Sequence, residues 1–336
     1  MSSRAVPDRN EGGDLASRRL RIAFVVDVFP LVSETFIIDQ VAGLLDRGVD
    51  VEIYSFSVGD ETNVARRYFD YDMHLRVTYL NYPIGKISRL VRVWPRVWRL
   101  MLRQRRVLLQ AINVPRHGRW ALSLKLLYWA EPLAGKQYDV VHCHFGTVAR
   151  DFVHAREAAG LSATPLVTTF YGVDVSRVFA DEDVSYYDEL KDVCSLYFVM
   201  SEDMRRRVIA YGFPADRVRV HPVGVDLDTH PFHPRTLDDG DELRVLAVGR
   251  FVEKKGFDDL LRALALVKKQ TSRPVSCVIV GDGPLDGELK QLTHELGIAA
   301  LVHFAGLQPV ERVVELMNDA HVLVTPSKTA ADGDME

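Results

Sequence analysis

Residues 243–261 read LRVLAVGRFVEKKGFDDLL, and this stretch decides the fold of the second half of the chain. Its apolar start, Leu243–Val248, predicts a buried strand, and the segment from Phe257 predicts an amphipathic helix. Arg250 and Lys255 lie between them, beside the expected helix N-terminus, where two cations suit a diphosphate. Arg can hold two phosphate oxygens at once, whereas Lys acts as a compact point charge. The stretch therefore predicts a strand–loop–helix unit with an anion site in its loop. The alternative is that the two lysines of the loop form a solvated turn.

The same alternation of short apolar runs and longer amphipathic runs extends along the rest of the chain, which is typical of parallel sheets covered by helices. In the first half we expect strands at 21–27, 51–57, 139–144, 166–169, 196–200 and 218–221, and helices at 33–46, 147–159 and 202–211. In the second half we expect strands at 243–248, 275–280, 301–304 and 322–325, and helices at 257–269, from 284 and at 309–318. The polar, proline-containing stretch 229–242 is the expected linker. The sequence thus predicts an α/β protein of two Rossmann-like domains, 21–228 and 243–336.

The two ends of the chain carry further expectations. Residues 1–20 are polar and lack an apolar core segment, so we expect a disordered start and not a signal peptide. The second domain has four expected strands, fewer than the six of a full doubly wound domain. We therefore expect this domain to be incomplete and the chain to be truncated at Glu336.

The bulk composition is that of a globular protein of the reducing cytoplasm. Apolar residues make up 47% of the 336 positions and charged residues 26%, which excludes a disordered chain. No apolar run reaches the length of about 18 residues that a membrane span requires. Cys143, Cys194 and Cys277 form no CxxC pair, so neither disulfides nor a zinc framework are expected.

The loop after the first strand holds a polar run, FPLVSETF at 29–36. It carries no GxGxxG glycines, which argues against a dinucleotide-dependent dehydrogenase. Ligands of open α/β sheets bind beyond the carboxyl ends of the strands, so Ser33, Glu34 and Thr35 are candidate cleft residues. Alternatively, Ser33 caps the following helix and Glu34 lies near its positive end. The two interpretations are compatible.

Two further strands end in candidate site residues. His142 and His144 alternate with Cys143 at the end of one strand and share a face. A metal site would need a third ligand that the local sequence lacks, so we predict no metal there and expect His144 to line the cleft. Another strand ends in GDGP at 281–284, where Gly281 and Gly283 allow the backbone to approach a ligand closely.

Five motifs, in this order, resemble those of glycosyltransferase family 4, the large retaining group with the GT-B fold. They are VMSE at 199–202, PVGVD at 222–226, GRFVEKKG at 249–256, VGDGP at 280–284 and TPS at 325–327. The order and spacing of the motifs carry the resemblance, which spans roughly residues 21 to 336. The run FPLVSETF, together with YGVDVS at 171–176, is similar to the exopolysaccharide branch of colanic-acid type.

The resemblance implies two domains facing a cleft and a set of site residues. The donor-binding residues it implies are Gly249, Arg250, Lys255, Gly281, Gly283 and Glu336. In these enzymes the two cations neutralise the diphosphate leaving group, so neither a divalent metal nor another cofactor is expected. Glu336 would open a Glu-x7-Glu motif and contact the transferred sugar.

On the opposite side of the cleft, His144 and Asp174 are the expected catalytic residues besides Glu336. Tyr171 is the expected acceptor-side residue together with Ser33, Glu34 and Thr35. Many relatives carry His at the position of Tyr171, and this departure puts its acceptor-side role in doubt.

The segment 86–130, hereafter the basic segment, holds eleven basic residues, no acidic residue and all four tryptophans. Five of its arginines recur at helical spacing and are expected to share one face: Arg89, Arg92, Arg96, Arg99 and Arg103. Pro95 would interrupt or kink that helix. A solvated arginine face over a core stripe is one interpretation, and a helix on an anionic membrane surface is the one we favour. Nucleic acid is disfavoured because no aromatic stacking platform or known binding fold accompanies the charge.

These observations favour one enzymatic function. We expect transfer of a sugar, with retention, from a UDP-, GDP- or ADP-sugar to a lipid-linked or polysaccharide acceptor. The setting would be exopolysaccharide or cell-surface glycan biosynthesis, in the cytoplasm at the inner face of the plasma membrane. The alternative is a non-catalytic truncated fragment of such an enzyme, membrane-associated, with weak or no donor binding.

Overall fold

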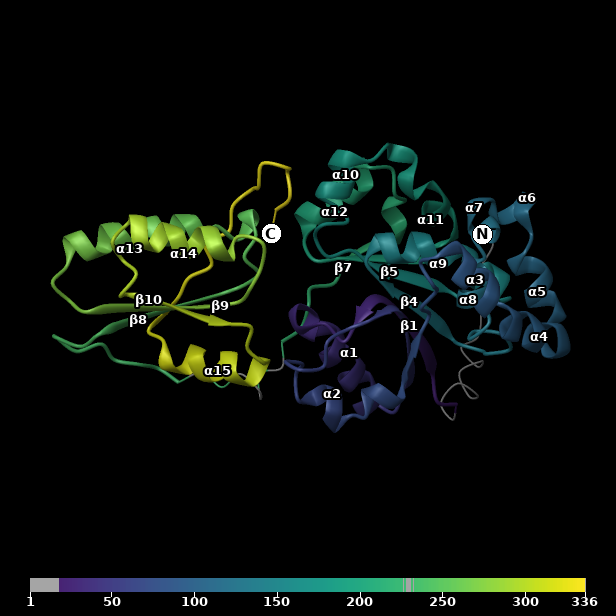
Figure 1. The fold of residues 1–336 in the computed structure, drawn as a ribbon, viewed down its shortest axis with the longest axis horizontal. Coiled ribbons are helices and arrows are strands. Elements are labelled where there is room, and N and C mark those ends of the chain that lie inside the picture. The colour runs from purple at the N-terminus through teal and green to yellow at the C-terminus, as the bar shows by residue number, and fades with distance from the viewer. Residues whose placement is uncertain (1–17, 226, 228–230, 232, 336) are drawn as a thin grey trace, which may run out of the picture.

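The computed structural model describes residues 18–225, 227, 231 and 233–335, and within them two parallel sheets form two domains (Figure 1). Most of the predicted disordered start, and Glu336 with it, lies outside these residues. The first sheet has the order β3-β2-β1-β4-β5-β6-β7 and the second the order β10-β9-β8-β11. The predicted α/β fold with two Rossmann-like domains is confirmed.

The strands of the first sheet are β1 (Arg21–Phe29), β2 (Asp50–Val58), β3 (Val77–Tyr79), β4 (Val140–His144), β5 (Leu166–Thr169), β6 (Leu196–Val199) and β7 (Val218–Val220). Those of the second are β8 (Leu243–Val248), β9 (Val275–Val280), β10 (Val302–Gly306) and β11 (Val322–Leu323). The edge strand β3 has three residues and was not predicted, because so short a run shows no alternation. The strand order reverses between β1 and β4, so the two loops after these strands diverge and leave a crevice at the carboxyl edge.

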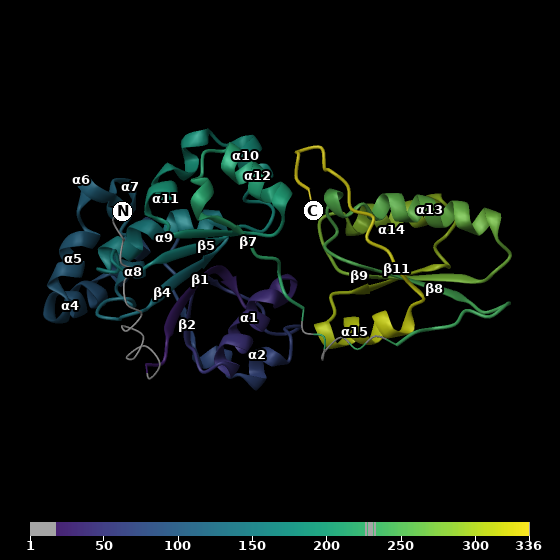
Figure 2. The same cartoon turned by 180° about the vertical axis from the view of Figure 1, so that it is seen from behind.

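Helices cover both faces of each sheet (Figures 1 and 2). In the first domain they are α1 (Thr35–Asp46), α2 (Arg67–Asp70), α3 (Lys86–Arg92), α4 (Trp94–Arg103), α5 (Arg105–Ala111), α6 (Val114–His117), α7 (Arg119–Leu122), α8 (Lys125–Ala130), α9 (Gly146–Ala158), α10 (Arg177–Asp181), α11 (Asp188–Val193) and α12 (Glu202–Ala210). In the second they are α13 (Phe257–Gln270), α14 (Asp286–Glu295) and α15 (Val310–Asp319). Pro95 lies in the first turn of α4, directly after the end of α3, as its missing N–H predicts.

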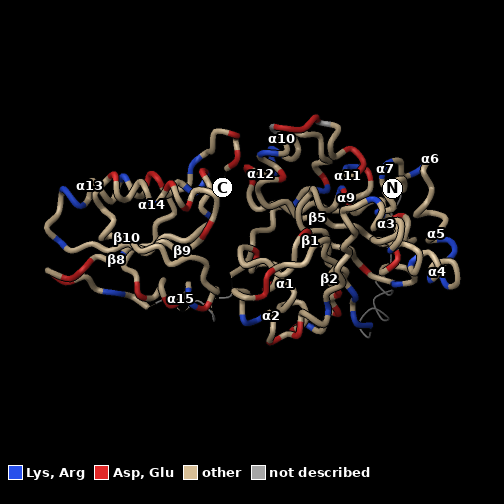
Figure 3. Tube along the Cα trace, viewed as in Figure 1, with Lys and Arg blue, Asp and Glu red and all other residues tan. Residues whose placement is uncertain are grey.

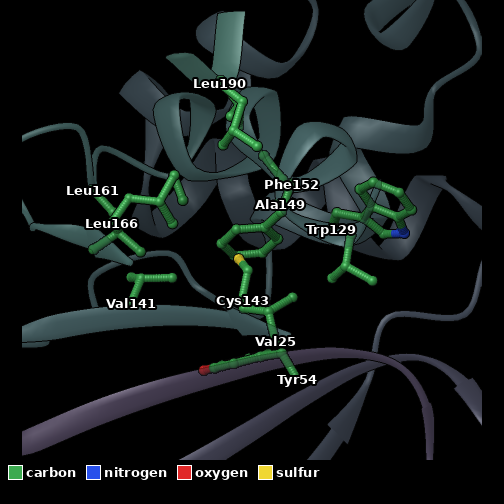
Figure 4. Close-up of a cluster of buried hydrophobic side chains, with 14 of the residues drawn as sticks. Val25, Tyr54, Trp129, Val141, Cys143, Ala149, Phe152, Leu161, Leu166 and Leu190 are labelled. Carbon is green, nitrogen blue, oxygen red and sulfur yellow. The ribbon is translucent and has the colours of Figure 1, made fainter. Parts of the chain in front are cut away.

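The core of the first domain lies on both faces of its sheet. Figure 4 shows Val25, Val141 and Cys143 of the strands packed beneath Ala149 and Phe152 of α9. A separate cluster beneath α1 and α2 fills the opposite face. Burial of these side chains orders the strands and so fixes the positions of the loops at their carboxyl ends.

The two domains meet at the carboxyl edges of their sheets. The N–H of Arg66 donates to Glu311 Oε1 of α15 at 2.7 Å, and Ser176 Oγ donates to Asp334 Oδ1 at 2.9 Å. In both views α15 lies beside α1 and α2, whereas the turn before the C-terminus lies beside α10 and α12 (Figures 1 and 2). The described residues between 227 and 242 form neither helix nor strand.

Candidate functional site

A pocket of about 210 Å³ lies between the two domains at the carboxyl ends of β8 and β9. The first domain contributes Val32, Ser33 and Thr35. The second contributes Val248, Gly249, Arg250, Val280, Gly281, Asp282, Leu307, Gln308, Val310 and Val313. Sequence-predicted residues of the donor side and the acceptor side therefore line one pocket.

The two glycines of the GDGP turn bring two loops of the second domain together. A Cβ on Gly281 would lie 1.9 Å from the carbonyl oxygen of Gly249, and one on Gly283 would lie 2.7 Å from the carbonyl oxygen of Phe251. Phe251 N–H donates to the carbonyl oxygen of Asp282 at 2.8 Å across the same contact. We predicted that these glycines allow approach to a ligand; what the structure shows is the close approach of two loops, which places Arg250 over the end of β9.

The loop after β8 ends in the 3₁₀ turn η5 (Glu253–Lys255), which presents the second cation. A Cβ on Gly249 would lie 3.4 Å from Lys255 Cδ, so the lysine stem lies against the end of β8. Lys254 is 8% exposed and lies 3.2 Å from Asp334 Oδ2. The alternative of a solvated turn is therefore wrong for Lys254.

Glu34 lies at the start of α1 and faces the second domain. The positive charge of Arg250 in that domain favours the ionised form of the Glu34 carboxyl. Burial and the nearby carboxylate of Asp27 raise the pKa of Glu34 to about 7, and Arg250 opposes this shift. Burial and Asp151 likewise raise the pKa of Asp27, against the effect of Lys125. Glu34, the carboxyl near the donor-side arginine, can therefore take up a proton near neutral pH.

Ser33 does not cap the helix. The residues Val32–Glu34 form a 3₁₀ turn, α1 begins at Thr35, and no side-chain hydrogen bond caps either element. The exposed Ser33 side chain lies at the pocket instead. The capping interpretation is therefore wrong, because the 3₁₀ turn moves the helix start two residues beyond the serine.

His144 is buried and paired with Tyr171. His144 Nδ1 lies 2.7 Å from Tyr171 Oη, and His142 Nε2 lies 2.7 Å from Thr169 Oγ1. The two imidazoles stack with centroids 4.5 Å apart. Burial lowers the pKa of His144 well below its usual value, so the ring is neutral, and its Nε2 has no hydrogen-bond partner. Tyr171 lines a separate cavity of about 660 Å³ beside α1, not the donor pocket.

Asp174 holds the loop after β5 in place. Its carboxylate accepts hydrogen bonds from the N–H groups of Gly146, Gly172 and Tyr171 at 2.9, 3.0 and 3.1 Å. The side chain is fully buried, and burial raises its pKa to about 6 against these three donors. These contacts tie the start of α9 to the loop that carries Tyr171. Within the described part of the chain, no three His, Cys, Asp or Glu residues lie close enough together to hold a metal ion.

Acidic residues from outside the basic segment neutralise more of its positive charge than its sequence suggests. Arg99 pairs with Glu131 at 2.7 Å, Arg116 with Glu157 at 2.7 Å and Lys125 with Asp151 at 3.5 Å. The window holds no acid, but the fold brings acids to it from residues further along the chain. Further Lys and Arg residues nevertheless lie along α4 and α5, as the blue positions of the trace show (Figure 3).

The tryptophans of the basic segment divide into two groups. Trp129 is 2% exposed and stacks on Phe56, so it belongs to the core. Trp94 and Trp98 are 68% and 60% exposed. Further exposed apolar side chains surround them on α3 to α5: Ile87, Leu90, Val91, Leu102 and Leu109. The alternative interpretation, a solvated arginine face over a core stripe, is therefore wrong for α3 and α4, where arginine and apolar side chains both reach the surface.

Comparison with known proteins decides the family. Residues 33–229 match the family described as Glycosyltransferase Family 4. The chain belongs to this family. Residues 229–333 match Glycosyl transferases group 1, so the two family matches meet in the predicted linker. The resemblance seen in the sequence motifs is confirmed, and the fold is GT-B.

Relatives in the family include two proteins of bacterial polysaccharide synthesis. The putative colanic acid biosynthesis glycosyltransferase WcaL of Escherichia coli (strain K12) is 29% identical over 94% of this chain and 78% of its own length. The amylovoran biosynthesis glycosyltransferase AmsK of Erwinia amylovora is 30% identical over the same shares. The crystal structure of Anabaena Alr3699/HepE in complex with UDP and glucose superposes with a TM-score of 0.60 at 19% identity, over 94% of this chain and 76% of that one.

Sequence reasoning missed several residues that the fold brings to the site of this family member. Asp27 follows the apolar core of β1, and its position at a strand end was a signal that could have found it. Ser176, Lys254 and Asp334 come together from three separate segments, and no local pattern marks that contact.

Proposed function

We propose that this member of glycosyltransferase family 4 transfers a sugar from a nucleotide-diphosphate sugar to a glycan acceptor, with retention at the anomeric carbon. The observation that carries the proposal is the pair Arg250 and Lys255 at the carboxyl end of β8, beside a pocket that both domains line. A pocket at this edge of a parallel sheet is where an α/β fold binds its ligand. The complexes of Anabaena Alr3699/HepE with UDP and with UDP-glucose support a nucleotide-sugar donor.

The chemistry requires charge neutralisation at the leaving group. As the bond between sugar and diphosphate breaks, negative charge grows on the diphosphate oxygens, and cations placed there stabilise the transition state more than the ground state. Arg250 can bind two of these oxygens in a fork, and Lys255 adds a point charge from η5. With both cations supplied by the protein, we propose that the reaction needs neither a divalent metal nor another cofactor.

For the acceptor we propose a lipid-linked or polysaccharide glycan of cell-surface synthesis. The two bacterial relatives, glycosyltransferases of colanic acid and amylovoran biosynthesis, support this class. His144, Tyr171, Ser33, Glu34 and Thr35 would form the acceptor side, with Asp174 holding the loop that carries Tyr171. Glu336 would contact the transferred sugar.

The basic segment would hold the protein at the inner face of the plasma membrane. Its exposed Trp94 and Trp98 lie among exposed apolar and arginine side chains, a combination that suits the interface of an anionic bilayer. Each basic residue near such a surface contributes about 1 kcal/mol. None of the described helices is long and apolar enough to cross a bilayer.

Donor binding tests the first part of the proposal. We expect the chain to bind at least one of UDP-, GDP- and ADP-glucose by calorimetry, and Arg250→Ala to weaken that binding about 10- to 100-fold, as expected for loss of a charged hydrogen-bond pair. Arg262→Ala, which removes an exposed arginine of α13, is the matched control. Unchanged affinity in Arg250→Ala would show that the donor site is misassigned.

Vesicle flotation tests the membrane contact. We expect binding to vesicles of anionic lipid, little binding to neutral phosphatidylcholine, and a loss of binding in the double variant Trp94→Ser and Trp98→Ser. The matched control is Trp120→Ser, which alters a tryptophan that is only partly exposed. Equal flotation with both lipids, or with neither, would exclude an anionic membrane surface as the partner.

A further inference from the structure

One carboxylate near the end of the described chain joins the two domains. Asp334 Oδ1 accepts a hydrogen bond from Ser176 Oγ at 2.9 Å, and Lys254 Nζ lies 3.2 Å from Asp334 Oδ2 and 3.3 Å from Oδ1. Ser176 belongs to the first domain and Lys254 to the second. The two are 9% and 8% exposed, so the carboxylate lies between groups that are nearly closed to solvent. In both views this turn bridges toward α10 and α12 (Figures 1 and 2).

On the side of the first domain, the contact ends on Ser176, which lies on a rigid loop and has a second hydrogen-bond acceptor there. The loop after β5 is fixed by the three backbone hydrogen bonds to Asp174. Ser176 Oγ lies 3.1 Å from the carbonyl oxygen of Gly172 as well as 2.9 Å from Asp334 Oδ1. A hydroxyl has one proton, so Ser176 can return it to Gly172 when Asp334 moves away. Opening the contact therefore leaves no buried donor unsatisfied, and its free-energy cost is small.

On the side of the second domain, the contact ends on the donor-binding turn. Lys254 directly precedes Lys255 in η5, and its carbonyl oxygen accepts the N–H of Lys328 at 2.9 Å. Gly256 has φ +65°, and a Cβ there would lie 2.0 Å from the carbonyl oxygen of Pro326. The segment 326–334 is thus packed against η5 at one end and reaches Ser176 at the other.

A second interdomain contact lies on the other side of the donor pocket. Glu311 Oε1 accepts the N–H of Arg66 at 2.7 Å, and the neighbouring Val310 both lines the pocket and packs on the core of the first domain. Domain contacts therefore flank the pocket, with Asp334 on one side and Glu311 on the other. A donor that touches both walls of the pocket binds the closed arrangement better than an open one.

We propose that Asp334 is a positioning residue that couples closure of the two domains to the orientation of the donor-binding turn. In the closed arrangement the Asp334 carboxylate pairs with Lys254 and accepts the hydrogen bond of Ser176 from the other domain. Because Lys254 and Lys255 are adjacent in η5, this contact also positions Lys255. When the domains part, Ser176 returns to Gly172 and the donor turn loses its tie to the first domain. This proposal rests on the proposed donor site and adds the element that controls how that site closes.

Three variants separate the two halves of the contact. Ser176→Ala removes the interdomain hydrogen bond together with the contact to the carbonyl oxygen of Gly172, and leaves the ion pair of Asp334 with Lys254. Asp334→Asn keeps an acceptor for Ser176 but removes that ion pair. Glu288→Gln is the control, because it removes an exposed carboxylate of α14 in the second domain and leaves the turn that carries Asp334 unchanged. Calorimetry with UDP-, GDP- and ADP-glucose, small-angle X-ray scattering and thermal melting are measured on each.

We expect Ser176→Ala and Asp334→Asn to weaken binding of the donor that the wild type takes by about 5-fold or more, the usual scale of coupling between sites. In Ser176→Ala the radius of gyration without donor should rise, and saturating donor should restore it. A merely structural role would lower the melting temperature and leave scattering unchanged. Wild-type affinity and scattering in both variants would overturn the proposal. If the wild type binds none of the three donors while it stays folded, the donor assignment fails instead.

Discussion

Glu34→Gln removes an acid that the fold holds protonated near neutral pH. The side chain is partly buried at the start of α1, and burial together with Asp27 raises its pKa from 4.5 to about 7 despite the opposing effect of Arg250. In the unfolded chain the carboxyl ionises near pH 4.5, whereas in the folded chain it keeps its proton to about pH 7. The unfolded state thus binds fewer protons in this window, so the wild type loses stability as the pH rises through it.

The size of the effect follows from the two pKa values. At about 1.4 kcal/mol for each tenfold change in proton affinity, the full loss across the window is about 3 kcal/mol. Most of it falls between pH 5 and pH 8, where the wild type should lose about 2 kcal/mol relative to Glu34→Gln. Glutamine has no proton to release, so its unfolding free energy should lack this component of the pH dependence.

Guanidinium unfolding followed by tryptophan fluorescence measures this difference. All four tryptophans lie in the first domain, which carries Glu34, so the signal reports the domain in question. Glu202→Gln removes an exposed carboxylate of the same domain and is the control for net charge. The reasoning is refuted if the difference in unfolding free energy between Glu34→Gln and wild type is the same at pH 5 and pH 8.

Two further substitutions test the loops that build the site. Asp174→Ala leaves the N–H groups of Gly146, Tyr171 and Gly172 without their acceptor. Each buried unsatisfied donor costs about 1–3 kcal/mol, so the substitution should lower the unfolding free energy by about 3 kcal/mol or more. A loss below about 1 kcal/mol in guanidinium unfolding would contradict the burial of this carboxylate. Gly281→Ala would place a Cβ 1.9 Å from the carbonyl oxygen of Gly249, so it should lower the melting temperature and abolish donor binding. Gly287→Ala is its control, because a Cβ there meets nothing within 4 Å and alanine favours the helix by about 1 kcal/mol; equal melting temperatures for the two variants would disprove the close contact of the loops.

The sequence by itself indicated the family and most of the strands. Strands and helices have different hydrophobic periodicities because side chains alternate on a strand and repeat every 3.6 residues on a helix. Leu243–Val248 and the helix after it could therefore be predicted from their local sequence. Arg250 and Lys255 could be assigned to the site from the sequence because they lie in the short loop that directly follows a strand. The order of five such local motifs then sufficed to indicate glycosyltransferase family 4.

Contacts between distant segments were decided only by the tertiary structure. The acids that pair with the basic segment, Glu131, Asp151 and Glu157, lie outside it in sequence, so the window looked fully uncompensated. The short helices α3 and α4 expose apolar and charged side chains together, which a helical-face argument could not foresee because the face that packs depends on neighbouring helices.

Around the donor pocket, too, the sequence predicted some residues and only the tertiary structure brought in the others. The donor-side cations could be named from the sequence, but the raised pKa of Glu34 comes from its burial and from the nearby Asp27, and Asp334 meets Ser176 across 158 positions of sequence. A side chain's burial and charge environment depend on which segments surround it, and that is set by how the two sheets are arranged in space, not by the residues next to it along the chain. Local patterns therefore indicated the donor-side cations and glycines, whereas the tertiary structure decided which further residues join the site and which of its groups act on one another.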